Sequence, residues 1–158
     1  MARRFWLLKS DPETFGWEDL LKSPRKTTAW DGVRNYQARN LLRDEIRVGD
    51  GVLFYHSQSA PPAVVGTAEV VRAGYPDPTQ FDARSKYRDA DSDPAEPRWY
   101  AVDIRAGREL DRPVTLPEMR EAPGLESMVL LRRGSRLSVQ PVTAAEWKIV
   151  LALAGRPG

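Results

Sequence analysis

The fold is decided most clearly by a turn followed by a strand, in the segment Val48-Gly49-Asp50-Gly51-Val52-Leu53-Phe54-Tyr55-His56-Ser57. Gly49-Asp50 is a turn signal, and the branched and aromatic residues after it favour a strand over residues 52–56. A second valine-rich run predicts a neighbouring strand over residues 63–73. The loop between the two strands contains two prolines, which limit its flexibility.

Further strands and helices are expected on both sides of this pair. Strands are expected at residues 5–9, 98–105 and 137–139, and helices at 17–22, 35–45, 116–121, 125–131 and 143–153. The last helix is marked by a capping box, in which Thr143 and Glu146 each satisfy a backbone N–H. Residues 76–97 predict a surface loop with one helical turn near Phe81. Because strands and helices do not alternate strictly, the chain is expected to be α+β with a mostly antiparallel sheet.

The composition suits one packed domain, expected over residues 1–158 with a flexible tail at 155–158. No apolar run approaches the roughly 20 residues needed to cross a bilayer, and residues 5–8 are too short for a signal-peptide core. The chain has no cysteine and one histidine, which argues against disulfides, the common zinc sites and zinc deaminases. We therefore expect a cytoplasmic protein without membrane partner, metal or cofactor.

Charge is distributed unevenly, although the net charge is only +2. One arginine cluster contains Arg34, Arg39, Arg43 and Arg47, and a second contains Arg132, Arg133 and Arg136. Acidic residues collect between them, over residues 77–96. Arginine suits phosphate groups and base edges, but a GC-rich genome would produce the same excess over lysine.

The stretch most informative for function is Trp30-Asp31-Gly32-Val33-Arg34-Asn35-Tyr36-Gln37-Ala38-Arg39-Asn40. It is too polar for a core strand and richer in planar side chains than an ordinary loop. Stacking rings, guanidinium groups and amides are the groups that read a nucleobase and its phosphate. In the alternative reading, Asp31-Gly32 is only a turn, Asn35 caps the following helix and Trp30 belongs to the core.

Five separated blocks resemble the EVE domain family. They are Phe5-Trp6-Leu7-Leu8-Lys9-Ser10-Asp11-Pro12, the turn and strand quoted first, Val65-Gly66-Thr67-Ala68-Glu69-Val70-Val71, Tyr75-Pro76-Asp77-Pro78-Thr79, and Arg136-Leu137-Ser138-Val139-Gln140-Pro141-Val142. With the Trp30 stretch, the resemblance covers about residues 4 to 153. It implies a PUA-like fold, a curved, mostly antiparallel β-sheet or barrel flanked by helices, and kinship with the YTH domain. It also implies binding of modified bases, notably modified cytosine in DNA.

With this resemblance, the sequence predicts a pocket that holds one base flipped out of its stack, without catalysis. Trp30 would stack on the base, Val33 would contact a methyl group, and Asn35 would meet the base edge. The other expected pocket residues are Lys9, Ser10, Tyr55, His56, Ser57, Ser138 and Gln140. Phosphate contacts are expected from Arg34, Arg39, Arg132, Arg133 and Arg136. The expected partner is nucleic acid, with DNA favoured and RNA possible.

Several of these residues also have a purely structural interpretation. His56 could be a satisfied side chain at a strand end, Ser10 a local cap, and Ser138 and Gln140 parts of a structural strand. Two other functions are left open. One is a small hydrolase using Ser10 or Ser57 as nucleophile, His56 as base and an aspartate such as Asp31. The other is a protein-interaction module that uses the proline-rich loops.

Overall fold

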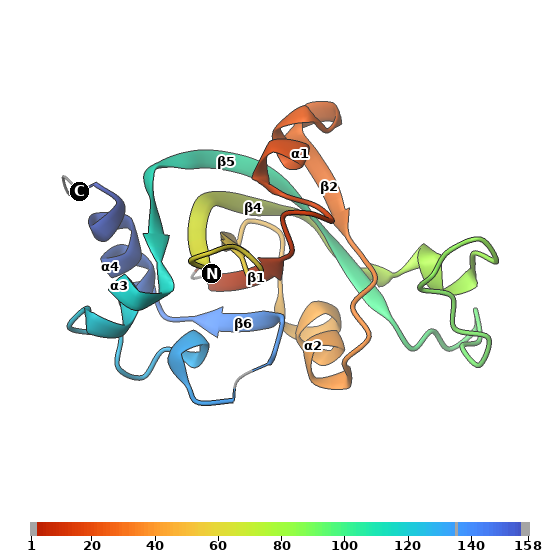
Figure 1. The fold of residues 1–158 in the computed structure, drawn as a ribbon. Coiled ribbons are helices and arrows are strands. Elements are labelled where there is room, and N and C mark those ends of the chain that lie inside the picture. The colour runs from red at the N-terminus through yellow and green to blue at the C-terminus, as the bar shows by residue number, and fades with distance from the viewer. Residues whose placement is uncertain (1–2, 135, 156–158) are drawn as a thin grey trace.

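The computed structural model describes residues 3–134 and 136–155, and its six strands form one curved sheet (Figure 1). The strand order is β2-β5-β4-β3-β1-β6. The strands are β1 (Phe5–Ser10), β2 (Thr27–Trp30), β3 (Gly51–His56), β4 (Ala63–Pro76), β5 (Tyr100–Thr115) and β6 (Val139–Val142). Strands β1 and β3 are parallel, and the other neighbouring pairs are antiparallel. The predicted α+β class with a mostly antiparallel sheet is confirmed.

The α-helices are α1 (Trp17–Lys22), α2 (Tyr36–Asn40), α3 (Leu116–Glu121) and α4 (Ala144–Ala154). A π turn, η2 (Leu41–Glu45), continues α2, and single 3-10 turns occur at η1 (Pro24–Lys26), η3 (Pro78–Phe81) and η4 (Val129–Leu131). The capping box of α4 is present as predicted. The helix expected at 125–131 is only the short turn η4. Gly155, where the tail was expected to begin, caps α4, and the rest of that tail lies outside the described residues.

Strands β4 and β5 are the long, bent strands that give the sheet its curvature, and they arch over β1 in Figure 1. Their pairing is interrupted by four register shifts, and such bulges bend a strand and increase its twist. The strand predicted at 98–105 begins at Tyr100 and continues beyond the predicted end to Thr115. Strand β2 was not predicted, and the strand expected at 137–139 instead begins at Val139.

The sheet separates two hydrophobic cores, because successive side chains of a strand point to opposite faces. On β3, Val52 and Phe54 belong to the core that also contains Trp30 and Trp17. Leu53 and Tyr55 belong to the second core, which α3 and α4 cover. Tyr55 is 3% exposed in that second core, so the structure places it on the face opposite to Trp30.

Residues 77–99 project from the body of the molecule as an arm, which includes the predicted helical turn as η3 (Figure 1). Buried Gln80 joins the two ends of this arm. Its amide nitrogen donates to the carbonyl oxygens of Asp77 (2.7 Å) and Trp99 (2.9 Å). Its amide oxygen accepts from the Ser92 hydroxyl (2.6 Å) and the Trp99 backbone N–H (3.1 Å). The arm is therefore ordered by buried polar groups.

Two features are absent from the residues that the structure describes. No helix in this part of the chain is long and apolar enough to cross a membrane. The same residues contain no group of three or more His, Cys, Asp or Glu side chains placed to hold a metal ion.

Candidate functional site

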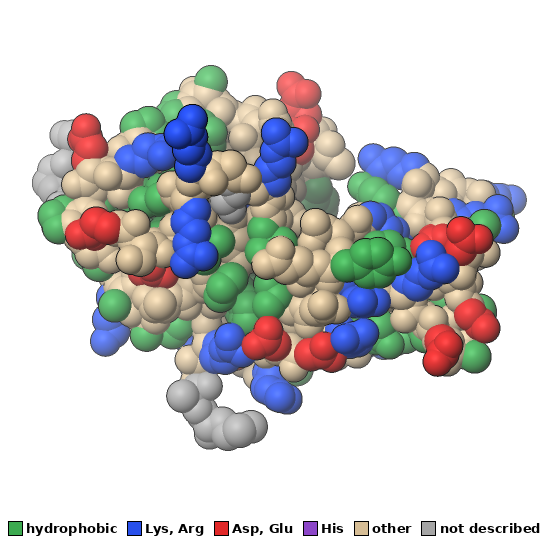
Figure 2. Space-filling view, turned by 90° about the horizontal axis from the view of Figure 1, so that it is seen from below, with side chains coloured by type: hydrophobic (Ala, Val, Ile, Leu, Met, Phe, Trp, Pro, Cys, Tyr) green, Lys and Arg blue, Asp and Glu red, His purple; other side chains and the backbone are tan. Residues whose placement is uncertain are grey.

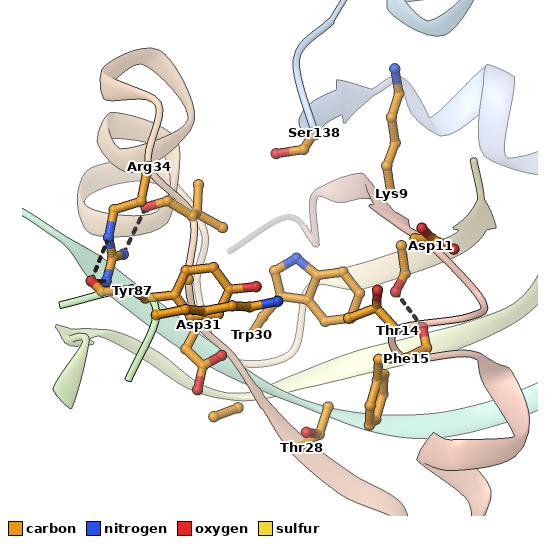
Figure 3. Close-up of a pocket in the computed structure, with 15 residues that line it drawn as sticks. Lys9, Asp11, Thr14, Phe15, Thr28, Trp30, Asp31, Arg34, Tyr87 and Ser138 are labelled. Carbon is orange, nitrogen blue, oxygen red and sulfur yellow. Dashed lines mark hydrogen bonds between the residues drawn. The ribbon is translucent and has the colours of Figure 1, made fainter. Parts of the chain in front are cut away.

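A cavity of about 620 Å³ opens where the end of β1, the following loop, the end of β2 and the arm meet (Figure 3). Trp30 stands in the middle of the wall, with Lys9 and Ser138 on one side of it and Phe15 and Thr28 on the other. The arm completes the wall with Tyr87. The volume falls within the range of sites that enclose small ligands.

The indole of Trp30 combines a buried edge with an open one. It is 9% exposed and packs edge-on against the buried ring of Phe54, with ring centroids 5.6 Å apart. No described residue accepts a hydrogen bond from its N–H, and Figure 3 shows this nitrogen on the side of the ring toward Ser138. The indole N–H groups of Trp6, Trp17 and Trp99, in contrast, each donate to a carboxylate. The free N–H of Trp30 is therefore available to a ligand.

Gly32 allows the arm to approach the pocket closely. Its φ of +74° lies in the left-handed region that favours glycine. A Cβ atom at this position would lie 2.7 Å from the ring of Tyr87. A larger residue would therefore displace Tyr87 from the pocket.

Asp77 and Arg34 fasten the arm to the rim. Buried Asp77 accepts hydrogen bonds from the backbone N–H groups of Gly32 (2.8 Å) and Thr79 (2.8 Å) and from the Thr79 hydroxyl (2.6 Å). Arg34 donates to Asp77 (3.1 Å) and to the Tyr87 carbonyl oxygen (2.6 Å). Burial opposes ionisation, but these hydrogen bonds outweigh it and hold the pKa of Asp77 below its ordinary value.

The wall of the cavity carries charges of both signs. Lys9, Arg34 and Lys86 bring positive charge to its wall, whereas Asp11 and Asp31 bring negative charge. Partial desolvation, reinforced by the nearby carboxylate of Asp77, raises the pKa of Asp31 above its ordinary value. Burial lowers the pKa of Lys9. An occupant with an anionic group and a hydrogen-bond donor edge would match this arrangement.

The chain also resembles known proteins. The model of the EVE domain family matches residues 4–153. The chain belongs to the EVE domain family. It is 41% identical to thymocyte nuclear protein 1 of Homo sapiens, over 94% of this chain and 72% of that protein. A crystal structure from Pseudomonas putida is 42% identical, with a TM-score of 0.89, and covers 95% of this chain and 99% of its own.

A third relative was solved with a ligand. The crystal structure of the human THYN1 protein in complex with 5-methylcytosine-containing DNA is 38% identical to this chain. Its TM-score is 0.91, and the match covers 98% of this chain and 99% of that one. These similarities confirm the PUA-like EVE fold that the sequence predicted.

Half of the expected pocket residues line the cavity of this EVE domain: Lys9, Ser10, Trp30, Val33 and Ser138. The others lie elsewhere. Asn35 is the N-cap of α2, and its side-chain oxygen accepts from the Ala38 backbone N–H (2.9 Å). This is the structural role considered as the alternative. Tyr55 faces the second core. Gln140 is buried on β6, where its amide donates to the Leu137 carbonyl oxygen (2.8 Å).

His56 and Ser57 hold the loop beside the pocket and do not line the cavity. Nε2 of His56 accepts a hydrogen bond from the backbone N–H of Trp17 (3.1 Å), at the first turn of α1. The N-cap residue of this helix is Gly16, which has no side chain to do so. The backbone N–H of Ser57 donates to the carbonyl oxygen of Ser10 (2.9 Å). Both residues therefore position the segment that carries pocket residues Thr14 and Phe15.

The hydrogen bond of His56 predicts a dependence of stability on pH. Burial lowers the pKa of His56 below 6.5, so the folded state favours the neutral ring. The contribution of this hydrogen bond to the free energy of unfolding is complete above about pH 6.5, and it is lost as the pH falls through the lower folded-state pKa of His56. We expect the wild type to lose about 1 kcal/mol more stability between neutral pH and about pH 5 than His56→Gln. Urea unfolding at both pH values measures this, and equal losses would contradict it.

The expected phosphate-binding arginines fall into two groups. Arg34 lines the cavity but is engaged with the arm, and Arg39 donates to the Arg98 carbonyl oxygen (2.6 Å). Arg132, Arg133 and Arg136 are exposed in the segment before β6, close in sequence to the pocket residue Ser138. Figure 2, which views the molecule from the side of α2 and β6, shows Lys and Arg side chains spread over this face among hydrophobic and acidic ones. A hollow separates the body from the arm.

The sequence prediction did not include Tyr87, Lys86 or Asp31 among the pocket residues. Tyr87 is an aromatic residue between basic neighbours, in Arg84-Ser85-Lys86-Tyr87-Arg88. That pattern is typical of nucleic-acid contacts, but it lies in a loop whose position relative to Trp30 only the fold defines.

Proposed function

We propose that this EVE domain binds nucleic acid, with DNA favoured over RNA, and holds one everted, modified cytosine against Trp30 without catalysis. The observation that carries this proposal is the open edge of the Trp30 indole in the cavity, with its N–H unbonded among the described residues. The human relative with the same fold, solved with 5-methylcytosine-containing DNA, supports the choice of ligand.

The energetics are compatible with this proposal. Everting a base costs a few kcal/mol. Stacking on an aromatic side chain returns about 1–3 kcal/mol, and burial of a methyl group adds about 0.8 kcal/mol. Val33 and Phe15 supply apolar surface in the cavity wall for such a methyl group. The discrimination between modified and plain cytosine should therefore be modest, of the order of severalfold, and phosphate contacts must supply further affinity.

Binding of matched oligonucleotides tests the proposal. Fluorescence anisotropy should show tighter binding of an oligonucleotide with one 5-methylcytosine than of the same sequence with cytosine. DNA and RNA versions of the pair decide between the two polymers. Equal affinity for modified and plain oligonucleotides of both kinds would contradict the proposal.

Asp31 favours cytosine over thymine at this position. Its carboxylate lies in the cavity wall beside Trp30, and an ionised carboxylate only accepts hydrogen bonds. Cytosine presents an amino group at C4, whereas thymine presents an acceptor oxygen there, and 5-methylcytosine and thymine share the methyl group. We expect the wild type to prefer 5-methylcytosine over thymine by roughly tenfold.

Asp31→Asn should remove this preference, because an amide can both donate and accept. Thymine and 5-methylcytosine are compared at one position of a single-stranded oligonucleotide, so that pairing energies do not interfere. In Asp31→Asn, the affinity for thymine should rise, and the affinity for 5-methylcytosine should change much less. An unchanged ratio in Asp31→Asn would show that Asp31 does not contact the base edge.

The hydrolase alternative receives less support from the geometry. Nε2 of His56 is occupied by the Trp17 backbone N–H, and the Ser10 hydroxyl donates to the Phe15 carbonyl oxygen. Turnover of an activated ester that disappears in His56→Ala would favour it over the binding function. Two other sequence predictions stay proposals, namely a single domain over residues 1–158 and a cytoplasmic location.

A further inference from the structure

A second cavity, of about 580 Å³, adjoins the first across strand β2. Strand β2 is an edge of the sheet and pairs with β5. Because side chains alternate along a strand, Thr28 shares the face of Trp30, and Thr27 and Ala29 point to the other face. The walls of both cavities include Thr28 and Ala29, so the two cavities lie on either side of the same short stretch.

The second cavity lies on the outer face of the sheet. On β5, Val102 and Ile104 belong to the core that contains Trp30. Asp103 and Arg105, which alternate with them, therefore face outward and line the second cavity. The short side chains of β2 stand opposite these two residues, since Ala29 pairs with Asp103 and Thr27 with Arg105. They leave a hollow beside long cationic side chains.

Three arginines, Arg25, Arg72 and Arg105, line this cavity. Arg72 lies 3.8 Å from the ring centroid of Tyr75, which holds its planar group in place. Among the residues that the structure describes, none forms an ion pair with Arg25 or Arg72. Arg105 pairs with Glu69 at 3.6 Å, and both side chains are about half exposed. The carboxylate of Asp103 in the same wall accepts a hydrogen bond from the Tyr75 hydroxyl.

The segment before β2 shows backbone strain. Arg25 has a φ of 56° and Lys26 a φ of 54°, in the left-handed region that non-glycine residues rarely adopt. Both side chains are exposed and basic. Strain of this kind is concentrated at functional sites, where it holds side chains in a required position. Here it holds two cationic residues at the edge of β2.

We infer that this second cavity, the outer arginine site, binds the phosphodiester backbone next to the everted base. The inference rests on the proposed function, because it places the base on the Trp30 side of β2. The nucleic acid that carries the base then passes over the edge strand β2. The cavity beside this strand is lined by Arg25 and Arg72, which form no ion pair with a described residue. Guanidinium forms bidentate hydrogen bonds with phosphate, so the match is one of charge and of geometry.

The double variant Arg25→Gln/Arg72→Gln tests the site, with Arg108→Gln as the matched control. Arg108 is an exposed arginine on β5, outside the walls of both cavities. Affinity for single-stranded oligonucleotides with 5-methylcytosine or cytosine is measured by anisotropy over a range of salt concentrations. The double variant should bind both roughly tenfold more weakly, and the slope of log affinity against log salt should fall by about 0.7 for each phosphate interaction that the substitutions remove.

The ratio between modified and plain oligonucleotides should stay as in the wild type, because phosphate contacts do not read the base. Affinity and salt slope equal to those of Arg108→Gln would overturn the outer arginine site. A wild type that binds both oligonucleotides equally would instead contradict the proposed function, and the salt slopes would still decide this inference. Inorganic phosphate competing as well as the oligonucleotide would show a free-anion site and also overturn it.

A second variant separates function from structure. Arg25→Gly should relieve the left-handed strain and raise the melting temperature, because glycine adopts this conformation at no steric cost. It should still weaken binding of both oligonucleotides. A variant that is more stable but binds as tightly as the wild type would show that Arg25 does not contact the backbone.

Discussion

Trp30→Ala is expected to abolish the preference for modified cytosine and to weaken binding of the modified oligonucleotide by about 1–3 kcal/mol. The indole forms the middle of the cavity wall, and no other described indole lines this cavity. Removal of the ring takes away both the stacking surface and the free N–H, whereas the arginines remain. Residual binding should therefore be dependent on salt and indifferent to the modification. Anisotropy titrations with the matched oligonucleotides measure both effects.

The control must account for the loss of packing, because Trp30 also touches Phe54 in the core. Trp147 is also 9% exposed, but it lies in the second core against Phe5. Trp147→Ala should cost stability of similar size, since both changes remove a largely buried indole. It should leave the preference for the modified base intact. Equal loss of preference in both variants would indicate general destabilisation and contradict the role of Trp30.

Asp77→Ala is expected to lower the free energy of unfolding by about 3 kcal/mol. The Asp77 side chain is fully buried and accepts from Gly32, Thr79 and Arg34. Alanine leaves the Arg34 guanidinium without its carboxylate, and the backbone N–H groups lose their acceptor. Urea unfolding measures the change. A loss below about 1 kcal/mol would show that the arm is held mainly by other interactions.

The same variant should also weaken recognition of the base. Gly32 follows directly after the pocket residues Trp30 and Asp31, and Arg34 holds the backbone of Tyr87. Loss of the Asp77 carboxylate therefore releases one side of the cavity. Asp89→Ala is the matched control, because Asp89 is another acidic residue of the arm, which accepts from the Trp99 indole and does not line the cavity. It should change the preference less than Asp77→Ala does.

Local sequence signals predicted the elements that depend on local chemistry. The capping box at Thr143 and Glu146 and the alternation along β3 are both present in the structure. Strand β2 was missed because it is short and polar, and its pairing with distant β5 stabilises it. The length of β5 was underestimated because its bulged outer part carries mostly polar residues.

The pocket was predicted in part for a similar reason. Trp30, Val33 and Ser138 were found by resemblance and chemistry, and the structure brings them to one cavity. Asn35 and His56 have side chains that could read a base, but each satisfies a backbone N–H at a helix start. Sequence alone could not distinguish these roles. It also could not show that the arm returns to place Tyr87 beside Gly32, because the buried Gln80 network fixes that path.

The indole resonances of the five tryptophans test the central claim most directly. In a ¹⁵N–¹H spectrum, Trp30→Phe identifies the Trp30 signal by its absence. Addition of a short oligonucleotide with one 5-methylcytosine should shift the Trp30 signal strongly, because a base bound against the ring changes the surroundings of its free N–H. The signal of Trp6, whose N–H is bonded to Asp50, should stay in place. Saturated binding of the oligonucleotide with the Trp30 signal unmoved would contradict a base bound against this ring.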